Sequence, residues 1–447
     1  MCPACRCGGR VRLSALLAVL ACWAVLAAPP ALAHVEVVGS TPVGGARLAG
    51  APSVVSVRLS ENVGIQKDAL RVVDARGQVV SDGPVFQPGE VAEEMAVRLR
   101  PGLGDGTYLV QYAFVSADTH PVRGGFAFVV GDGPLMNASG AVSDTTDNGS
   151  VAVLTKVVRW VGYLGVALAG GVLFLLYCRP RGTADPRARA LMLGGCALAA
   201  VGGVLTLGME GAHVTGADLS RVFAPELVAN TLDSAYGKLL VLRVVAALGL
   251  AFVARRLFAG PPPRLRSRYE NLAMVSGFLL LLTSAAAGHA IAAEVMFVTL
   301  LADLAHYGAV AVWLGGVVQL ALCAWRPQPE EDLGAVMARF SSVAKVSVAV
   351  IVISGGLLGV AYVGSVAALV DTPYGLLLLG KLAGFALLLV LADRCRRAVR
   401  QGLTGTSGST LVGVRVGTLR RVLAAEVVVA AAVLAVAAVV ATTAPPP

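Results

Sequence analysis

The chain has no cysteine between His34 and Pro134, and this absence excludes disulfide bonds as the support of that region. Small exported domains with thin cores are usually held together by disulfides. A domain here must therefore rely on the packing of its apolar side chains. The eight cysteines lie in the first 33 residues and beyond residue 177, and a cleaved leader would remove the first group.

Nucleotide-binding motifs are also missing. The chain contains neither the Gly-x-x-x-x-Gly-Lys-Ser/Thr loop nor the aspartyl-phosphate motif of a transport ATPase. We therefore expect no enzyme activity. Any transport would run on the gradient of the transported ion, on ligand exchange or on another gradient.

Charged residues make up only 14% of the chain, whereas hydrophobic residues make up 56%, more than in a soluble protein. The apolar excess is confined to residues 151–443, where it forms blocks of about 20 residues, the length that crosses a bilayer. The sequence predicts an exported domain over 34–130, a polar linker over 131–150 and a membrane domain over 151–443.

The first 33 residues have the order of a secretory signal peptide, with arginines, then an apolar run, then Ala31-Leu32-Ala33. Cleavage after Ala33 would make His34 the first residue, whose α-amine and imidazole can chelate one metal ion. In the alternative, Val19-Leu20-Ala21-Cys22 serves as a lipoprotein box and Cys22 is lipidated.

The exported domain shows the period-two alternation of β-strands. Apolar residues alternate with others at Val55, Val57 and Leu59, at Met95, Val97 and Leu99, and from Tyr108 to Phe114, with Gly/Pro turns between the runs. About seven short strands in under 100 residues predict an all-β, immunoglobulin-like sandwich or small barrel.

A candidate metal site lies in this domain. Asp118 and His120 are two residues apart, so an extended backbone points both side chains the same way. Together with the amine and imidazole of His34 they supply three nitrogens and one oxygen, a set that suits tetragonal Cu(II). Alternatively, Asp118 and His120 simply cap a surface turn.

The exported domain resembles the periplasmic copper-binding CopC family. The matching segments are His34 at a mature N-terminus, Ser40-Thr41-Pro42-Val43-Gly44, Leu59-Ser60-Glu61-Asn62-Val63, Gly106-Thr107-Tyr108 and Ser116-Ala117-Asp118-Thr119-His120-Pro121. The resemblance implies Cu(II) ligation by His34, Asp118 and His120. Thr119 stands where the family usually has Gly. Met95 is the only methionine between His34 and Pro134, so we expect no thioether-rich Cu(I) site.

Eight membrane spans are predicted, at about 151–177, 188–208, 236–258, 272–291, 297–324, 343–366, 374–393 and 420–442. Arginines gather in every second connection, which the positive-inside rule assigns to the cytoplasm. We therefore expect a multi-pass protein of a bacterial cytoplasmic membrane, with the exported domain and the C-terminus outside. Because the arginines flank spans in the lipid bilayer, the net charge of +9 does not indicate nucleic-acid binding.

All five histidines fall on the outer side of this topology. Two lie at the outer part of spans: His289 ends the fourth, and His306 lies within the fifth. Ionisable residues inside spans are rare and usually functional. The sequence therefore suggests a copper path that receives metal from the exported domain, formed by His289, His306, Asp303, Glu294 and Met209. The alternative is that His306 only hydrogen-bonds another helix and that Asp303 caps its span.

The membrane part resembles the CopD family of copper-resistance proteins, through Gly288-His289-Ala290, His306 with Val312-Trp313-Leu314-Gly315-Gly316, and Pro373-Tyr374-Gly375 with Leu379-Gly380-Lys381. The resemblance implies copper movement across the membrane, usually thought inward, for uptake, homeostasis or resistance. Two alternatives remain: a b-type cytochrome with His289 and His306 as haem ligands, and a binding-only copper buffer or sensor. The sequence names no copper chaperone or reductase as partner.

Overall fold

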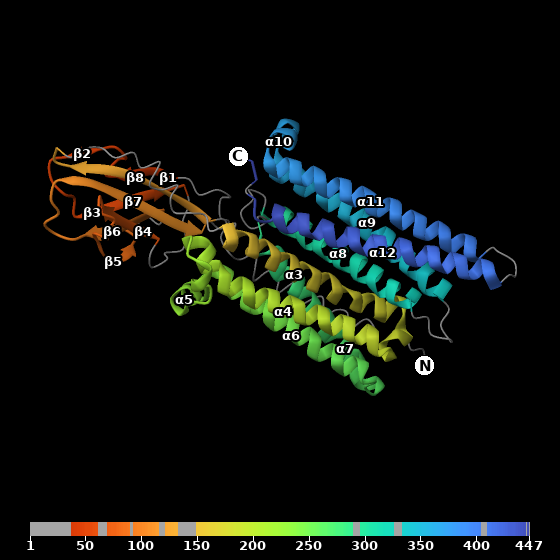
Figure 1. Ribbon diagram of the computed structural model, residues 1–447. Coiled ribbons are helices and arrows are strands. Elements are labelled where there is room, and N and C mark those ends of the chain that lie inside the picture. The colour runs from red at the N-terminus through yellow and green to blue at the C-terminus, as the bar shows by residue number, and fades with distance from the viewer. Residues whose placement is uncertain are drawn as a thin grey trace.

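The computed structural model describes residues 37–60, 69–89, 93–115, 121–132, 149–288, 296–325, 333–403, 409–443 and 445–446. Strands occupy the chain up to residue 130, and helices follow from residue 149 (Figure 1). The β domain lies at one end of a long helical bundle, and the C-terminus of the chain lies at that same end.

The β domain is a sandwich of two four-stranded sheets, ordered β1-β3-β6-β5 and β2-β8-β7-β4. The strands are β1 Val37–Thr41, β2 Arg47–Leu48, β3 Val54–Leu59, β4 Leu70–Asp74, β5 Ser81–Phe86, β6 Glu94–Leu99, β7 Gly106–Val115 and β8 Pro121–Val130. The described residues thus hold eight strands rather than about seven. β2 has only two residues, too few to show alternation in the sequence.

The core between the sheets follows the predicted alternation. Val55, Val57 and Leu59 of β3 are buried against Val110 of β7 and Phe128 of β8. These residues belong to one apolar cluster that draws on both sheets. Burial of this cluster stabilises the domain without a disulfide, because apolar area removed from water contributes about 25 cal/mol per Å².

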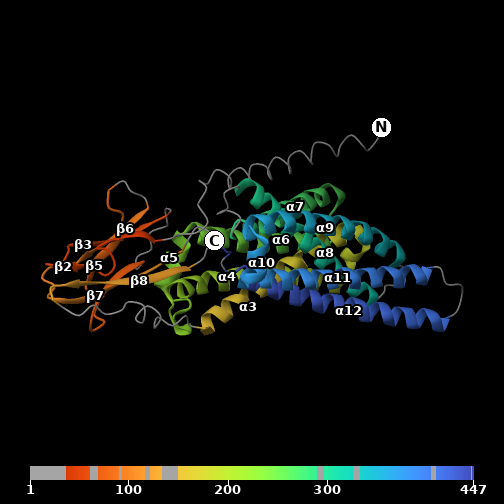
Figure 2. The same ribbon diagram turned by 90° about the horizontal axis from the view of Figure 1, so that it is seen from above.

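The hairpin of β7 and β8 is directed at the helical bundle. β2 pairs with Val129 and Val130 at the end of β8 and lies at the far end of the domain (Figures 1 and 2). The other end of the hairpin, where Val115 pairs with Pro121, therefore faces the helices. Both β7 and β8 contact α4.

The helices are α3 Gly149–Leu173 (continued by a π-helical turn to Cys178), α4 Pro186–Thr215, α5 Pro225–Asp233, α6 Ala235–Phe258, α7 Pro263–Ala285, α8 Met296–Trp325, α9 Leu333–Val363, α10 Val366–Asp371, α11 Pro373–Leu403 and α12 Ser409–Val440. In the part of the chain that the structure describes, seven of them are long and apolar enough to cross a membrane: α3, α4, α6, α8, α9, α11 and α12.

The fourth predicted span, 272–291, is not among the seven. α7 covers part of this range, but it begins with Arg264, Arg266, Arg268 and Glu270 and ends at Ala285. The apolar segment inside the helix is therefore short. The arginine Arg243 of α6, two turns into that helix, donates to the carbonyl oxygen of Thr283 at 2.7 Å. Thr283, two residues before the end of α7, therefore lies within reach of the Arg243 side chain rather than beside the first turn of α6.

Small residues let α3 and α8 cross at close range, as is common between membrane helices. A Cβ added at Gly315 of α8 would collide with the backbone of Ala167 and Gly171 of α3, whereas one added at Gly356 of α9 would meet nothing within 4 Å.

We expect Gly315→Ala to destabilise the helical bundle by about 1–3 kcal/mol, because overpacking forces backbone shifts. Gly356→Ala, the same change in an open helical position, should be neutral or slightly stabilising. Thermal unfolding of the purified proteins in detergent measures both. Equal midpoints for the two variants would contradict the close crossing.

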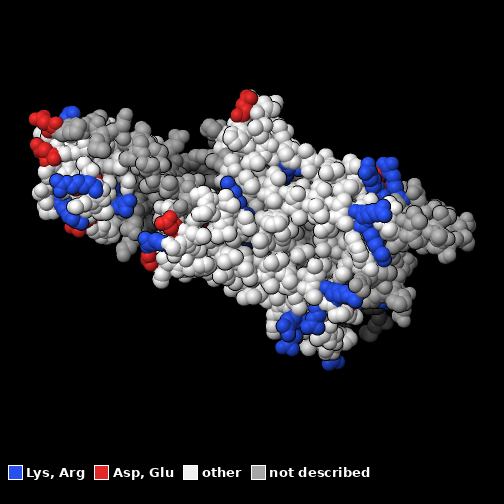
Figure 3. Space-filling view, in the orientation of Figure 1, with Lys and Arg blue, Asp and Glu red and all other residues white. Residues whose placement is uncertain are grey.

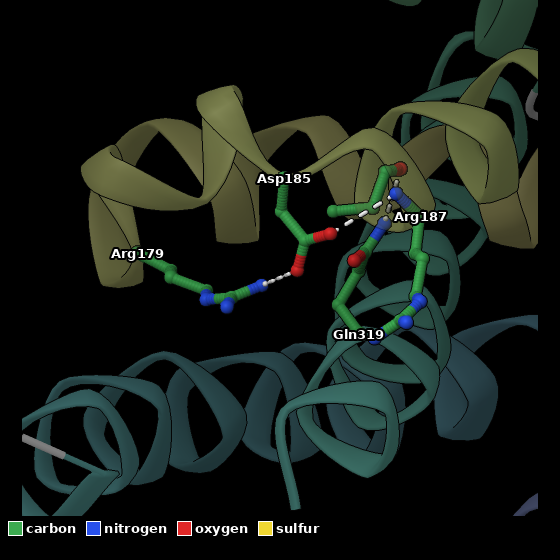
Figure 4. A network of polar contacts seen from close by, with 5 residues as sticks. Arg179, Asp185, Arg187 and Gln319 are labelled. Atoms are coloured by element: carbon green, nitrogen blue, oxygen red, sulfur yellow. Dashed lines mark hydrogen bonds and ion pairs between the residues drawn. The ribbon is translucent and has the colours of Figure 1, made fainter. Parts of the chain in front are cut away.

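A buried polar network closes the turn between α3 and α4. Arg179, whose side chain is 0% exposed, pairs with Asp185 at 3.0 Å, and Asp185 also caps α4 by accepting from the Arg187 N–H. Gln319 of α8 donates to the Ala188 carbonyl at 3.3 Å. Figure 4 shows how these groups join α4 to α8. The turn is thereby fixed to the bundle.

Lys and Arg gather at the end of the bundle away from the β domain (Figure 3). They include Arg255 and Arg256 in the last turn of α6 and the arginines at the start of α7. The acidic Asp371, in contrast, ends α10 near the other end. The charge is therefore distributed asymmetrically along the bundle axis.

Candidate functional site

His306 lies ten residues into α8 and is held against α9. Its Nδ1 is 3.1 Å from Ser354 Oγ, and Ser354 Oγ donates to the Val350 carbonyl at 2.6 Å. Because the serine proton is used in that bond, Ser354 accepts from Nδ1–H. The proton therefore sits on Nδ1 and the lone pair on Nε2. The ring also forms a hydrogen bond with the backbone of Ile351 on α9.

This arrangement is the one that orients a metal-ligating histidine, since the second ring nitrogen usually donates to a neighbouring oxygen and fixes the tautomer. The ring is also confined sterically. A Cβ added at Gly355 would lie 3.3 Å from His306 Cε1. His306 can thus offer Nε2 to a metal ion without first changing its tautomer.

Asp303, one turn before His306, connects three elements. Its Oδ2 would lie 3.9 Å from a Cβ added at Gly288, just beyond the end of α7. The ammonium group of Lys381 on α11 is close enough to interact electrostatically with both Asp303 and His306. The Asp303 side chain therefore lies beside the end of α7 and within electrostatic range of Lys381.

Tyrosines surround this pair. Tyr307 of α8 donates to the Tyr163 hydroxyl of α3 at 3.3 Å, and Tyr362 and Tyr374 also lie within electrostatic range of Asp303. We call Asp303, His306, Ser354 and Lys381, with these tyrosines, the α8 cluster. In the described residues, no three His, Cys, Asp or Glu side chains come close enough to hold a metal ion together.

Profiles of known families cover most of the chain. One described as "CopC domain" matches residues 37–131, one described as "Copper resistance protein D-like, N-terminal domain" matches 150–298, and one described as "Copper resistance protein D" matches 334–440. Copper resistance protein C of Escherichia coli is 32% identical over 107 residues, 22% of this chain and 83% of that protein. The chain belongs to the CopC family, and its helical part matches the two copper resistance protein D models.

One similar protein aligns with both the CopC domain and the helical part of this chain. Copper transport protein CutJ of Bacillus subtilis is 28% identical over 386 residues, 83% of this chain and 69% of that protein. CopC from Methylosinus trichosporium OB3b, a solved structure, has 25% sequence identity and a TM-score of 0.21, covering 22% of this chain and 95% of that one. The resemblance to CopC and CopD predicted from the sequence is confirmed. With seven candidate spans, the chain is a multi-pass membrane protein.

The predicted Cu(II) ligands of the CopC domain, His34, Asp118 and His120, lie outside the described residues, as do His289 and Glu294 of the CopD part. The strands next to His34, Asp118 and His120 are described. β1 begins at Val37, and Val115 and Pro121 bracket the segment with Asp118 and His120. Met95 is 1% exposed in the core of the CopC domain, so its thioether packs between the sheets.

Met209 does not join the α8 cluster. It is 2% exposed and packs with Val151, Val158, Ala212 and Leu227. The structure therefore places Met209 in an apolar core at the α3–α4–α5 contact, where the side chain fills space. Its neighbour Glu210 is 4% exposed, and neither carboxylate oxygen has a hydrogen-bond partner among the described residues.

Glu210 belongs to a second buried group of charges in the CopD part. Arg159 of α3 lies within electrostatic range of it, while the Arg159 Nη1 donates to the Ala441 carbonyl at 2.9 Å. The sequence did not lead us to Arg159 or Arg243, and Lys381 was named only as part of the CopD-like segment Leu379-Gly380-Lys381. The sequence did contain a signal for these residues, because an arginine or lysine inside an apolar span is rare and usually functional.

Proposed function

We propose that the CopC domain binds Cu(II) outside the cytoplasmic membrane through His34, Asp118 and His120, and that copper then passes to the CopD part and moves inward across the membrane. The protein acts as a carrier in copper uptake, homeostasis or resistance and not as an enzyme. The observation that carries the membrane step is the His306 side chain inside α8, whose ring is oriented by the contact of its Nδ1 with Ser354 Oγ.

The orientation of the two parts supports the transfer. The end of the β7–β8 hairpin that brackets Asp118 and His120 faces the bundle. The arginine-rich end of the bundle is the opposite one, and the positive-inside rule places it in the cytoplasm. In this topology α7 is an additional crossing, the fourth of eight in chain order, and its helix ends at Ala285.

Cellular copper content tests the proposal. A strain that lacks the protein should accumulate less copper than its complemented parent, and an unchanged content would favour a binding-only buffer or sensor. An optical spectrum of the purified protein tests the cytochrome alternative. A Soret band of reduced haem would favour that alternative over copper transport.

The mature protein should begin at His34. Its α-amine and imidazole then supply two of the four Cu(II) ligands, and the amine exists only after cleavage. Mass spectrometry of the protein extracted from membranes measures the terminus. A lipidated start at Cys22 would remove the amine and exclude the ligand set as proposed.

A further inference from the structure

Two charged side chains buried in the CopD part have polar atoms without hydrogen bonds. Glu210, five residues before the end of α4, is 4% exposed, and neither of its carboxyl oxygens has a hydrogen-bond partner among the described residues. The Nε of Arg159 on α3 is buried and also lacks a partner there. The guanidinium is anchored elsewhere, because its Nη1 donates to the Ala441 carbonyl at 2.9 Å. Buried polar groups are nearly always hydrogen-bonded, so this unmade pair needs an explanation.

Packing places the two residues near each other at the α3–α4 contact. The helices cross closely, since a Cβ added at Gly202 of α4 would lie 2.8 Å from the Cα of Gly162 on α3. The residues that precede Arg159 and Glu210 in the chain belong to one buried apolar cluster. Side chains lean toward the N-terminus of their helix, so the two side chains of these antiparallel helices lean toward each other.

The surroundings of Glu210 favour its neutral form. Arg159 of α3 and Tyr236 of α6 lie within electrostatic range of it, but neither donates a hydrogen bond to its oxygens. α5 packs the apolar Leu227 against the same part of α4, and His213 follows one turn later on α4 itself. Burial of an ionised carboxylate without a hydrogen bond is strongly unfavourable. The Glu210 carboxyl group therefore holds a proton in this arrangement.

From these contacts we infer that Glu210 is a proton-exchange site: it carries a proton in the metal-free protein and releases it to the outer solution as a copper ion enters the CopD part. The inference rests on the proposed function. A cation that enters adds positive charge where charges are weakly screened. Loss of one proton from Glu210 reduces that added charge by one, and the carboxylate left behind pairs with the Arg159 Nε–H.

Two tyrosines connect this site with the α8 cluster. Tyr163 lies one turn after Arg159 on the same face of α3. Tyr307 of α8, which follows His306 in the chain, donates to the Tyr163 hydroxyl at 3.3 Å, and the ring centroids are 5.9 Å apart. The two hydroxyl dipoles can reorient when an ion binds at His306. Glu210 is thereby coupled to the occupancy of the α8 cluster through polar groups.

Infrared difference spectra of the purified full chain, recorded before and after Cu(II) is added with a thiol reductant, test the inference. Wild type should lose the C=O stretching band of one protonated carboxyl group and gain the bands of a carboxylate. Glu210→Gln should lack this change. Glu226→Gln, which alters an exposed carboxylate on α5, is the matched control and should behave as wild type. In weakly buffered solution Glu210→Gln should also release about one proton fewer per chain.

Thermal unfolding separates proton exchange from a purely structural ion pair. Gln has nearly the shape of a neutral glutamic acid side chain, so Glu210→Gln should unfold at the wild-type midpoint if Glu210 carries a proton. Replacement of an ionised Glu210 would instead leave the buried Arg159 charge uncompensated, which is strongly destabilising. A lowered midpoint of Glu210→Gln would therefore overturn the inference.

The spectra separate the inference from the proposed function. A carboxyl band that persists in wild type after copper loading, while copper still enters vesicles, would overturn the inference and leave transport standing. A wild-type band change in Glu210→Gln would overturn it as well, because another carboxyl group would then be the source. Failure of copper to enter vesicles that contain the wild-type protein would contradict the proposed function itself.

Discussion

Replacement of His120 by alanine is expected to weaken Cu(II) binding by the CopC domain by more than about 100-fold. Loss of a group that only supports a ligand already costs 10- to 100-fold in metal affinity, and His120 is proposed as a ligand itself. The remaining His34 and Asp118 would leave the tetragonal site incomplete. A competition titration with a Cu(II) chelator measures the affinity, and EPR reports the change in the ligand set.

Asp118→Ala and Asp82→Ala form a matched pair for this experiment. Asp82 is an exposed carboxylate on β5, so its loss should leave the Cu(II) affinity unchanged, while loss of Asp118 should lower it. Binding by wild type should also weaken below about pH 6, because protons compete with copper for the imidazoles and the amine. An unaltered affinity of the His120 variant would refute the assignment.

Replacement of His306 by alanine is expected to reduce copper accumulation to the level of a strain without the protein, while the Cu(II) affinity of the CopC domain stays at its wild-type value. The change removes the one imidazole of the α8 cluster, and the CopC domain folds around a separate core. Copper content of cells and a chelator titration of the CopC domain measure the two effects. Ser354→Ala should give a smaller loss of copper accumulation. The His306 ring can then take either tautomer, but its imidazole is still present to bind the metal.

His213→Ala is the control for His306→Ala, since His213 lies in the last turn of α4 and outside the α8 cluster. It should accumulate copper normally. Loss of a buried hydrogen bond can cost about 1–3 kcal/mol, so the membrane content of each variant is measured alongside. Normal insertion combined with normal accumulation in His306→Ala would reduce this residue to a packing role.

Much of the fold could be predicted from local patterns. The alternation around Val55 and Val97 indicated strands, and apolar blocks located most of the long helices. β2 was missed because pairing of two residues with Val129 and Val130 leaves no periodic signal. α7 was taken as a full span because hydropathy shows where apolar residues lie but not that the helix stops at Ala285.

The candidate site was predicted only where one residue carries its own signal. His306 and Asp303 stand out as polar side chains in an apolar helix, and the structure describes both. Their partners Ser354 and Lys381 are 48 and 75 or more residues away in the sequence, and no local pattern links them. Met209 was assigned to the path by its estimated depth alone, and in the structure it is buried among apolar side chains that include Leu227.

Uptake of copper into proteoliposomes tests the central claim most directly. The purified full chain is reconstituted, Cu(II) is supplied outside with a thiol reductant, and the metal inside is measured after external copper is removed with a chelator. The account predicts time-dependent internal copper with wild type and the level of empty vesicles with His306→Ala. Copper that stays entirely outside with wild type, although the CopC domain binds it, would contradict transport.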